Sequence, residues 1–143
     1  MILQFATFAI FVLLLTSVSD GKIFGRCQMA SILVKNGFPR RDIPDWICMI
    51  YHESSFNTRI KNRKRDGSID YGIFQINDKC WCAPPGPYNF CNIHCSKLVD
   101  DNIRDDMKCA KLIFRRRYFY AWKGWRKFCH RRNLRWYVKG CKY

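Results

Sequence analysis

Acidic residues are scarce in this 143-residue chain. Asp and Glu total 11 against 26 Lys and Arg, so the formal net charge is +15, and no acid occurs from Met107 to Tyr143. A basic surface of this strength attracts polyanions through its long-range field. A solvated basic face that only maintains solubility is the simpler alternative. Because 48% of the residues are hydrophobic, the charge does not indicate disorder, and the length suits one compact domain.

Several other features are missing. The sequence has no zinc-finger spacing, no basic region followed by heptads and no RNP-like strand, so no specific nucleic-acid partner is expected. It also lacks internal repeats and low-complexity segments. Beyond the N-terminus there is no further long apolar run, so we expect no membrane span and a soluble mature protein.

The N-terminus carries the one long apolar segment. Residues 8–15 are all apolar, and no charge occurs from 2 to 19. This run is shorter than the roughly 20 residues that cross a bilayer, and it is typical of the core of a secretory signal peptide. We therefore expect a signal peptide at 1–21 and a secreted, extracellular domain at 22–143. An uncleaved anchor is the alternative.

Nine cysteines in so short a chain indicate a disulfide-stapled secreted protein. The sequence alone does not select one pairing, because eight cysteines can pair in very many ways. A zinc site built from Cys80-x-Cys82 and Cys91-x-x-x-Cys95 is the alternative.

Periodicity predicts an α+β fold. Apolar residues at helical spacing predict helices at Cys27–Asn36, after Asp42, over Ile103–Phe114 and over Ala121–Cys129. Between them, Asp66-Gly67 is a hairpin turn signal, and Ile69, Tyr71 and Ile73 alternate at strand period. Residues 83–92 are rich in Pro, Gly and Asn and are expected to form a loop. A β-hairpin lobe packed against a helical lobe would leave a ligand-binding cleft.

Two carboxyl groups would flank this cleft. Glu53 follows an apolar stripe on the second helix, so burial should raise its pKa toward the range that a general acid needs. Asp70 lies on the hairpin strand among polar residues that can keep it ionised. Carboxyls in such contrasting environments suit glycoside hydrolysis. The simpler alternative is that Glu53 is an ordinary acid on the helix surface and that Asp70 only stabilises a turn.

The segments around both carboxyls resemble the c-type (animal) lysozymes. The matching stretches are KIFGRC at 22–27, ESSFNT at 53–58, DGS and DYGIFQIN within 66–77, CNIHC at 91–95 and AWKGW at 121–125. The resemblance covers essentially all of 22–143. The sister family, the α-lactalbumins, usually lacks the catalytic glutamate, whereas both acids are present here.

The resemblance implies a lysozyme-like fold and a retaining glycosidase without a catalytic cofactor. Its expected substrate is the β-1,4 bond between N-acetylmuramic acid and N-acetylglucosamine in bacterial peptidoglycan. Glu53 would protonate the glycosidic oxygen, and Asp70 would act as nucleophile or stabilise the oxocarbenium-like transition state. The implied cleft residues are Asn62, Gln75, Asn77, Trp81 and Trp122, the last packed on the acid. The implied disulfides are Cys27–Cys141, Cys48–Cys129, Cys82–Cys95 and Cys91–Cys109.

Three features depart from the family pattern. Cys80 has no partner in the implied disulfide scheme and stands where relatives have an aromatic residue that stacks on a sugar. The loss of this stacking residue predicts weaker oligosaccharide binding. The thiol of Cys80 either links two copies of an otherwise monomeric protein or is shielded. Lys64 replaces an Asn near the nucleophile. The stretch RRRYFY at 115–120, which begins with the run Arg115–Arg117, replaces an acid and small residues at the cleft rim. This region is shorter than in vertebrate relatives and closer to invertebrate ones.

An acidic segment at 97–106 resembles the calcium loop of α-lactalbumins and calcium-binding lysozymes. The implied Ca²⁺ ligands are the backbone carbonyls of Lys97 and Asn102 and the carboxylates of Asp100, Asp105 and Asp106. The segment lacks the glycine and final glutamate of an EF-hand. Alternatively, these acids only favour a helix N-terminus. Calcium is the stronger reading, because carboxylates this close repel one another unless a cation neutralises them.

The sequence therefore predicts an antibacterial muramidase that acts on peptidoglycan and adsorbs to the anionic bacterial envelope. Two alternatives remain open. One is a cationic antimicrobial protein that disrupts envelopes without cleavage, which the Arg-rich C-terminal half supports. The other is a saccharide-binding or regulatory protein without catalysis, which the departures at Cys80 and Lys64 would suit.

Overall fold

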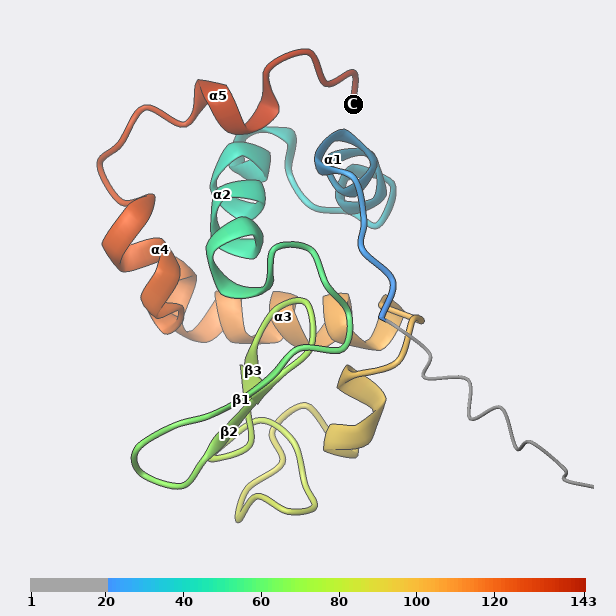
Figure 1. Cartoon of the computed structure of the whole chain (residues 1–143), viewed down its shortest axis with the longest axis vertical. Helices are drawn as coiled ribbons and strands as arrows, with labels where there is room; N and C mark the ends of the chain where they lie inside the picture. Colours follow the sequence, from blue (N-terminus) through green and yellow to red (C-terminus); the bar gives the residue numbers. More distant parts are fainter. Residues whose placement is uncertain (1–20) are drawn as a thin grey trace, which may run out of the picture.

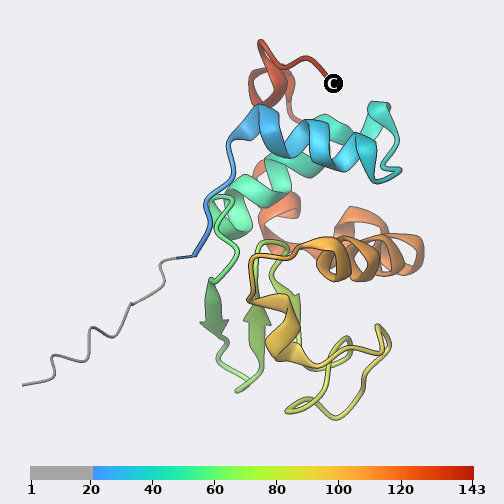
Figure 2. The ribbon, with the colours of Figure 1, turned by 90° about the vertical axis from the view of Figure 1, so that its right-hand side faces the viewer.

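A computed structural model describes residues 21–143, so the expected signal peptide lies outside the described residues except for Gly21. The helices are α1 (Arg26–Lys35), α2 (Ile43–Ser54), α3 (Arg104–Arg117), α4 (Lys123–Phe128) and α5 (Arg135–Val138). The strands are β1 (Lys61–Arg63), β2 (Ile69–Tyr71) and β3 (Ile76–Asn77). Short 3₁₀ segments occupy Arg40–Asp42, Cys95–Leu98 and Tyr118–Ala121. In both ribbon views α3 crosses between the other helices and the sheet (Figures 1 and 2), which confirms the predicted α+β class.

Four of the five described helices follow predicted segments, whereas α5 lies where no helix was expected. α1 ends just before Gly37, which has φ +82. α2 begins with Pro44 in its first turn, as the sequence indicated. The prediction for the fourth helix is wrong at its start: Ala121 belongs to a 3₁₀ segment, and Trp122 is extended with φ −102 and ψ 122. The extended backbone lets the Trp122 ring turn toward the sheet lobe and bury itself there.

The sheet brings three polar side chains into line. Its order is β1-β2-β3, antiparallel throughout, with Asn62 opposite Asp70 and Asp70 opposite Asn77. Residues directly opposite each other share a face of the sheet. The strand does not continue to Ile73, because the chain turns at Gly72 with φ +74. A Cβ on Gly72 would lie 1.7 Å from the carbonyl oxygen of Leu98, so only glycine fits this turn.

The core is built around Trp46 of α2, which is almost completely buried. Its ring contacts aromatic rings from both lobes at centroid distances from 4.8 to 6.1 Å: Phe38, Phe74, Phe114, Phe119 and Trp122. Around the same helix pack α1, α4 and α5. Because Phe74 comes from the sheet lobe, this cluster fixes the sheet relative to α2.

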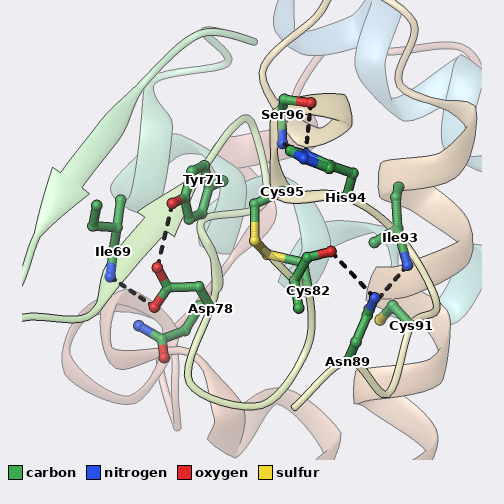
Figure 3. The surroundings of a disulfide bond; sticks show 12 residues. Ile69, Tyr71, Asp78, Cys82, Asn89, Cys91, Ile93, His94, Cys95 and Ser96 are labelled. Atoms are coloured by element: carbon green, nitrogen blue, oxygen red, sulfur yellow. Dashed lines mark hydrogen bonds between the residues drawn. A yellow bond between two sulfur atoms is a disulfide. The ribbon is translucent and has the colours of Figure 1, made fainter. Parts of the chain in front are cut away.

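The structure contains the four disulfides that the resemblance implies: Cys27–Cys141, Cys48–Cys129, Cys82–Cys95 and Cys91–Cys109. Three of the four cysteines in the alternative zinc site are therefore disulfide-bonded and cannot bind a metal, and Cys80 remains as a free thiol. Beside Cys82–Cys95, the Asp78 carboxylate accepts hydrogen bonds from the Ile69 amide at 3.0 Å and the Tyr71 hydroxyl at 3.3 Å (Figure 3). These contacts attach the long loop after β3 to the sheet.

Within residues 21–143, none of the helices combines the length and the apolar character needed to cross a bilayer.

Candidate active site

Glu53, the only glutamate in the chain, lies at the C-terminal end of α2. Its Oε1 accepts a hydrogen bond from the backbone N–H of Gly124 at 2.7 Å. A Cβ at Gly124 would lie 2.9 Å from Oε1 and 3.2 Å from the Cβ of His52. The absence of a side chain at Gly124 therefore makes room for the carboxyl group against the first turn of α4.

Burial raises the pKa of Glu53 above its ordinary value. The Gly124 N–H opposes this shift, the negative charge of Asp70 adds to it, and the cations Lys64 and Arg126 reduce it. Desolvation dominates because it disfavours the ionised form. The carboxyl thus retains its proton to higher pH than an exposed glutamate, as the sequence predicted.

Asp70 lies at the centre of β2 and is 8% exposed. Its Oδ1 accepts a hydrogen bond from Asn77 Nδ2 at 2.8 Å, and its Oδ2 lies 3.4 Å from Lys64 Nζ. Burial nevertheless outweighs both contacts and raises the pKa of Asp70. The expected polar setting is present, but the strand is more deeply buried than the sequence suggested.

Of the amide side chains near Asp70, Asn77 bonds to its carboxylate, whereas Asn62 and Gln75 bond to each other. Asn77 Nδ2 also donates to Ser68 Oγ at 3.0 Å, which holds it against Asp70. Asn62 instead donates to Gln75 Oε1 at 2.8 Å and makes no hydrogen bond to Asp70. Gln75 in turn donates to the carbonyls of Ile60 and Gly72 at 3.1 and 2.9 Å. Asn62 and Gln75 therefore brace β1 against the turn at Gly72.

A pocket of about 120 Å³ lies between α2, the sheet, α3 and the segment before α4. Glu53 and Asp70 both line it, together with four of the five predicted cleft residues: Gln75, Asn77, Trp81 and Trp122. Asn62 is outside the lining. Trp122 forms a rigid wall, because it is buried and its Nε1 donates to the Phe74 carbonyl at 2.8 Å. Two cations, Lys64 and Lys123, also line the pocket.

Two aromatic residues that the sequence analysis missed form a chain of rings that starts from Trp81, which lines this pocket. Phe90 donates its N–H to the Cys80 carbonyl at 3.0 Å, which places its ring 5.9 Å from that of Trp81. Tyr88 stacks on Phe90 at 6.3 Å, and the Arg116 guanidinium lies 5.0 Å from the Phe90 centroid. Both rings are exposed. Two aromatic residues within a Pro- and Gly-rich segment were the available signal in the sequence.

The acidic segment forms a candidate cation site. Carboxylate oxygens of Asp100, Asp105 and Asp106 lie within 4.8 Å of one another. Asp106 is 1% exposed, and neither of its carboxylate oxygens has a hydrogen-bond partner among the described residues. Burial, with the neighbouring Asp105 carboxyl, raises the pKa of Asp106 to about 9. An unpartnered buried carboxylate beside two others fits the oxygen ligands that Ca²⁺ prefers.

Asp101, the fourth acid of this segment, faces away from the cluster. Its carboxylate accepts hydrogen bonds from Thr58 Oγ1 at 2.8 Å and from Arg59 at 3.3 Å. This orientation agrees with its omission from the expected ligand set.

Comparison with known proteins gives a consistent result. Residues 22–141 match the model of the C-type lysozyme/alpha-lactalbumin family. "Lysozyme c-1" of Anopheles gambiae is 43% identical over 91% of this chain and 93% of its own length. "Lysozyme C II" of Oncorhynchus mykiss is 41% identical over 93% of this chain and 97% of its own length. "Lysozyme" of Bombyx mori is 45% identical over 78% of this chain and 82% of its own length. The fold is therefore the lysozyme fold, and the chain belongs to the C-type lysozyme/α-lactalbumin family as a glycoside hydrolase.

Proposed function

We propose that this protein hydrolyses the β-1,4 bond between N-acetylmuramic acid and N-acetylglucosamine in peptidoglycan, with retention and without a catalytic cofactor. The supporting observation is that Glu53 and Asp70, from different lobes, line one pocket in different settings. Glu53 has a single backbone donor, whereas Asp70 has an amide donor and an ammonium group.

These settings suit a division of roles, which follows the lysozyme type case. Protonated Glu53 donates to the glycosidic oxygen as the bond breaks. Ionised Asp70, held by Asn77 and Lys64, stabilises the positive charge that develops at the anomeric carbon or bonds to it. Glu53, now a carboxylate, then removes a proton from the water that completes hydrolysis. Trp81 and Asn77 contact the sugars, and the adjoining rings of Phe90 and Tyr88 take over the stacking role that Cys80 cannot fill.

A turbidity assay on a bacterial cell suspension tests the proposal. Glu53→Gln keeps the shape of the side chain but removes the proton donor, so lysis should stop while the melting temperature changes little. Asp42→Asn is the control, because Asp42 lies outside the cleft and pairs with the well-exposed Arg41. Full lysis by Glu53→Gln would refute the assignment.

Secretion after removal of residues 1–21 is part of the proposal. The backbone nitrogen of Lys22 donates to Thr58 Oγ1 at 3.1 Å and Asp101 Oδ1 at 3.2 Å. Cleavage before Lys22 would create an ammonium group at this nitrogen, and Asp101 would supply its counter-charge. Four disulfides also require an oxidising compartment. N-terminal sequencing of the exported protein should begin at Lys22; a retained leader would contradict this.

We also propose a structural Ca²⁺ at the candidate cation site. Asp100, Asp105 and Asp106 would supply carboxylate oxygens, and Lys97 and Asn102 would supply carbonyls. The buried carboxylate of Asp106 supports the proposal. Bound Ca²⁺ would neutralise the cluster and hold the start of α3, with no part in bond cleavage.

A second activity, binding to anionic envelopes without cleavage, is favoured by the outer face formed by α2, α5 and the end of α4. Tyr51, Phe128 and Trp136 are 41%, 43% and 61% exposed. They form a continuous surface, because Tyr51 contacts Trp136 at 6.2 Å and His52, and His52 stacks on Phe128 at 4.2 Å. Aromatic rings beside cations suit the interface of an anionic membrane. The same charge opposes self-association, so we propose a monomer.

Vesicles test this second activity in the Glu53→Gln background. Binding to phosphatidylglycerol vesicles should survive this substitution and should fall when Trp136→Ala and Arg135→Gln are added. Phosphatidylcholine vesicles serve as the neutral control. Equal binding to both lipids would contradict the proposal.

A further inference from the structure

We propose that Arg65, Lys64 and Lys123 form a site at the mouth of the cleft for a carboxylate carried by the substrate, so that the enzyme prefers anionic glycans to neutral ones. This inference rests on the proposed function and specifies the substrate class of that same cleft.

The site is a hollow that continues the cleft. It has a volume of about 600 Å³ and is lined by Arg63, Lys64, Arg65, Asp66 and Lys123. Lys64 and Lys123 also line the pocket that contains Glu53 and Asp70. The sheet lobe supplies one side of the hollow and the start of α4 supplies the other. A glycan bound across the two carboxyls would therefore extend past these cations.

The single acid in the hollow does not neutralise them. The Asp66 carboxylate accepts hydrogen bonds from the Ser68 hydroxyl at 2.6 Å and the Ser68 amide at 3.0 Å, and it pairs with Lys79 at 3.2 Å. These contacts hold the pKa of Asp66 at about 2. The carboxylate of Asp66 thus bonds within its own turn and pairs with Lys79, which lies outside the hollow.

The three proposed cations remain available. Arg63 donates to the Gly67 carbonyl at 3.1 Å and is not included. Among residues 21–143, Arg65 and Lys123 form no ion pair or side-chain hydrogen bond, and both are exposed. Lys64 lies 3.4 Å from Asp70, but its side chain is 46% exposed. An ammonium group has three donors, so Lys64 can bind Asp70 and a substrate carboxylate together.

The expected effect is moderate. Each exposed ion pair contributes little in water. Loss of the pairs made by Arg65 and Lys123 should therefore weaken the affinity for a carboxylate-bearing substrate by roughly fivefold to tenfold. The preference should appear mainly in KM, because Arg65 and Lys123 make no hydrogen bond or ion pair with Glu53 or Asp70. It should also weaken as salt increases.

Matched substrates provide the test. The Arg65→Gln/Lys123→Gln variant is compared with the wild type on soluble peptidoglycan fragments with free carboxylates, on the same fragments after amidation, and on a neutral N-acetylglucosamine oligomer. We expect KM to rise roughly fivefold to tenfold for the carboxylate form only. The Arg40→Gln/Arg41→Gln variant removes the same charge from a distant exposed segment, and it should leave all three KM values within about twofold.

For the Arg65→Gln/Lys123→Gln variant, equal losses on charged and amidated fragments would overturn the inference, and so would equal losses in both double variants. Wild-type enzyme that cleaves charged and amidated fragments with the same KM would also refute it, while leaving the proposed function intact. Wild-type enzyme that cleaves none of the substrates would instead refute the proposed function. Lys64→Gln is measured separately, because its contact with Asp70 adds an effect on kcat.

Discussion

The backbone N–H of Gly124 lies 2.7 Å from Oε1 of Glu53, and this contact joins the end of α2 to the first turn of α4. The position of the proposed acid therefore depends on a glycine 71 residues further along the chain. The donor favours the ionised carboxylate, whereas burial favours the protonated form. Their balance keeps the proton available without leaving the side chain free to move.

Substitution of this glycine should impair catalysis more than binding. In Gly124→Ala, the added Cβ would displace the Glu53 carboxyl or the helix behind it. A displacement of about 1 Å can cost roughly a hundredfold in rate, so kcat should fall by about tenfold to a hundredfold with little change in KM. Gly25→Ala is the control, because its Cβ would meet nothing closer than 3.7 Å. A Gly124→Ala enzyme with wild-type kcat would contradict this role.

The pH profile should respond to the hydrogen bond between Asn77 and Asp70. Activity requires ionised Asp70 and protonated Glu53, so it falls below the pKa of the first and above that of the second. The Asn77 donor lowers the pKa of Asp70; Asn77→Leu should therefore move the acidic limb to higher pH and leave the alkaline limb in place. Ser68→Ala removes the support behind Asn77, together with the hydroxyl's hydrogen bond to Asp66, but leaves the Asn77–Asp70 hydrogen bond in place, so it should cause a smaller shift. An unchanged acidic limb would show that Asp70 does not control it.

Calcium should stabilise the folded protein through Asp106. At roughly a hundredfold excess over Kd, a ligand adds about 2.7 kcal/mol to the free energy of unfolding. Thermal melts with CaCl₂ and with chelator should differ for the wild type and coincide for Asp106→Asn, whose lytic activity should be retained. Asp42→Asn should keep the calcium response. Identical wild-type melts with and without calcium would disprove the site.

Loss of the exposed ring beside Trp81 should weaken the binding of long glycans. Phe90→Ala removes a ring that contacts Trp81, Tyr88 and Arg116. Aromatic contacts contribute about 0.5–1.5 kcal/mol beyond area burial, so KM for a hexasaccharide should rise by roughly threefold to tenfold at constant kcat. Phe128→Ala, on the outer face, should leave KM unchanged. The same KM in both variants would remove Phe90 from the cleft.

The sequence by itself determined most local structure, because the signals are local. Periodic apolar residues, Pro44 at the start of α2 and Gly37 after α1 act within a few residues of themselves, and the helices follow them. The motifs around Glu53 and Asp70 likewise predicted the family, which the comparisons confirm. The Asp66-Gly67 turn correctly placed β2 opposite β1.

Only the tertiary structure decided how distant side chains meet. It turned Asn62 toward Gln75, directed Asp101 away from Asp106, extended Trp122 out of its expected helix and placed the Gly124 N–H against Glu53. None of these contacts follows from residue type or spacing, because each depends on how two separately formed elements pack. The physical reason is that burial and side-chain direction at such junctions are set by the shared core around Trp46, which exists only after the lobes have closed.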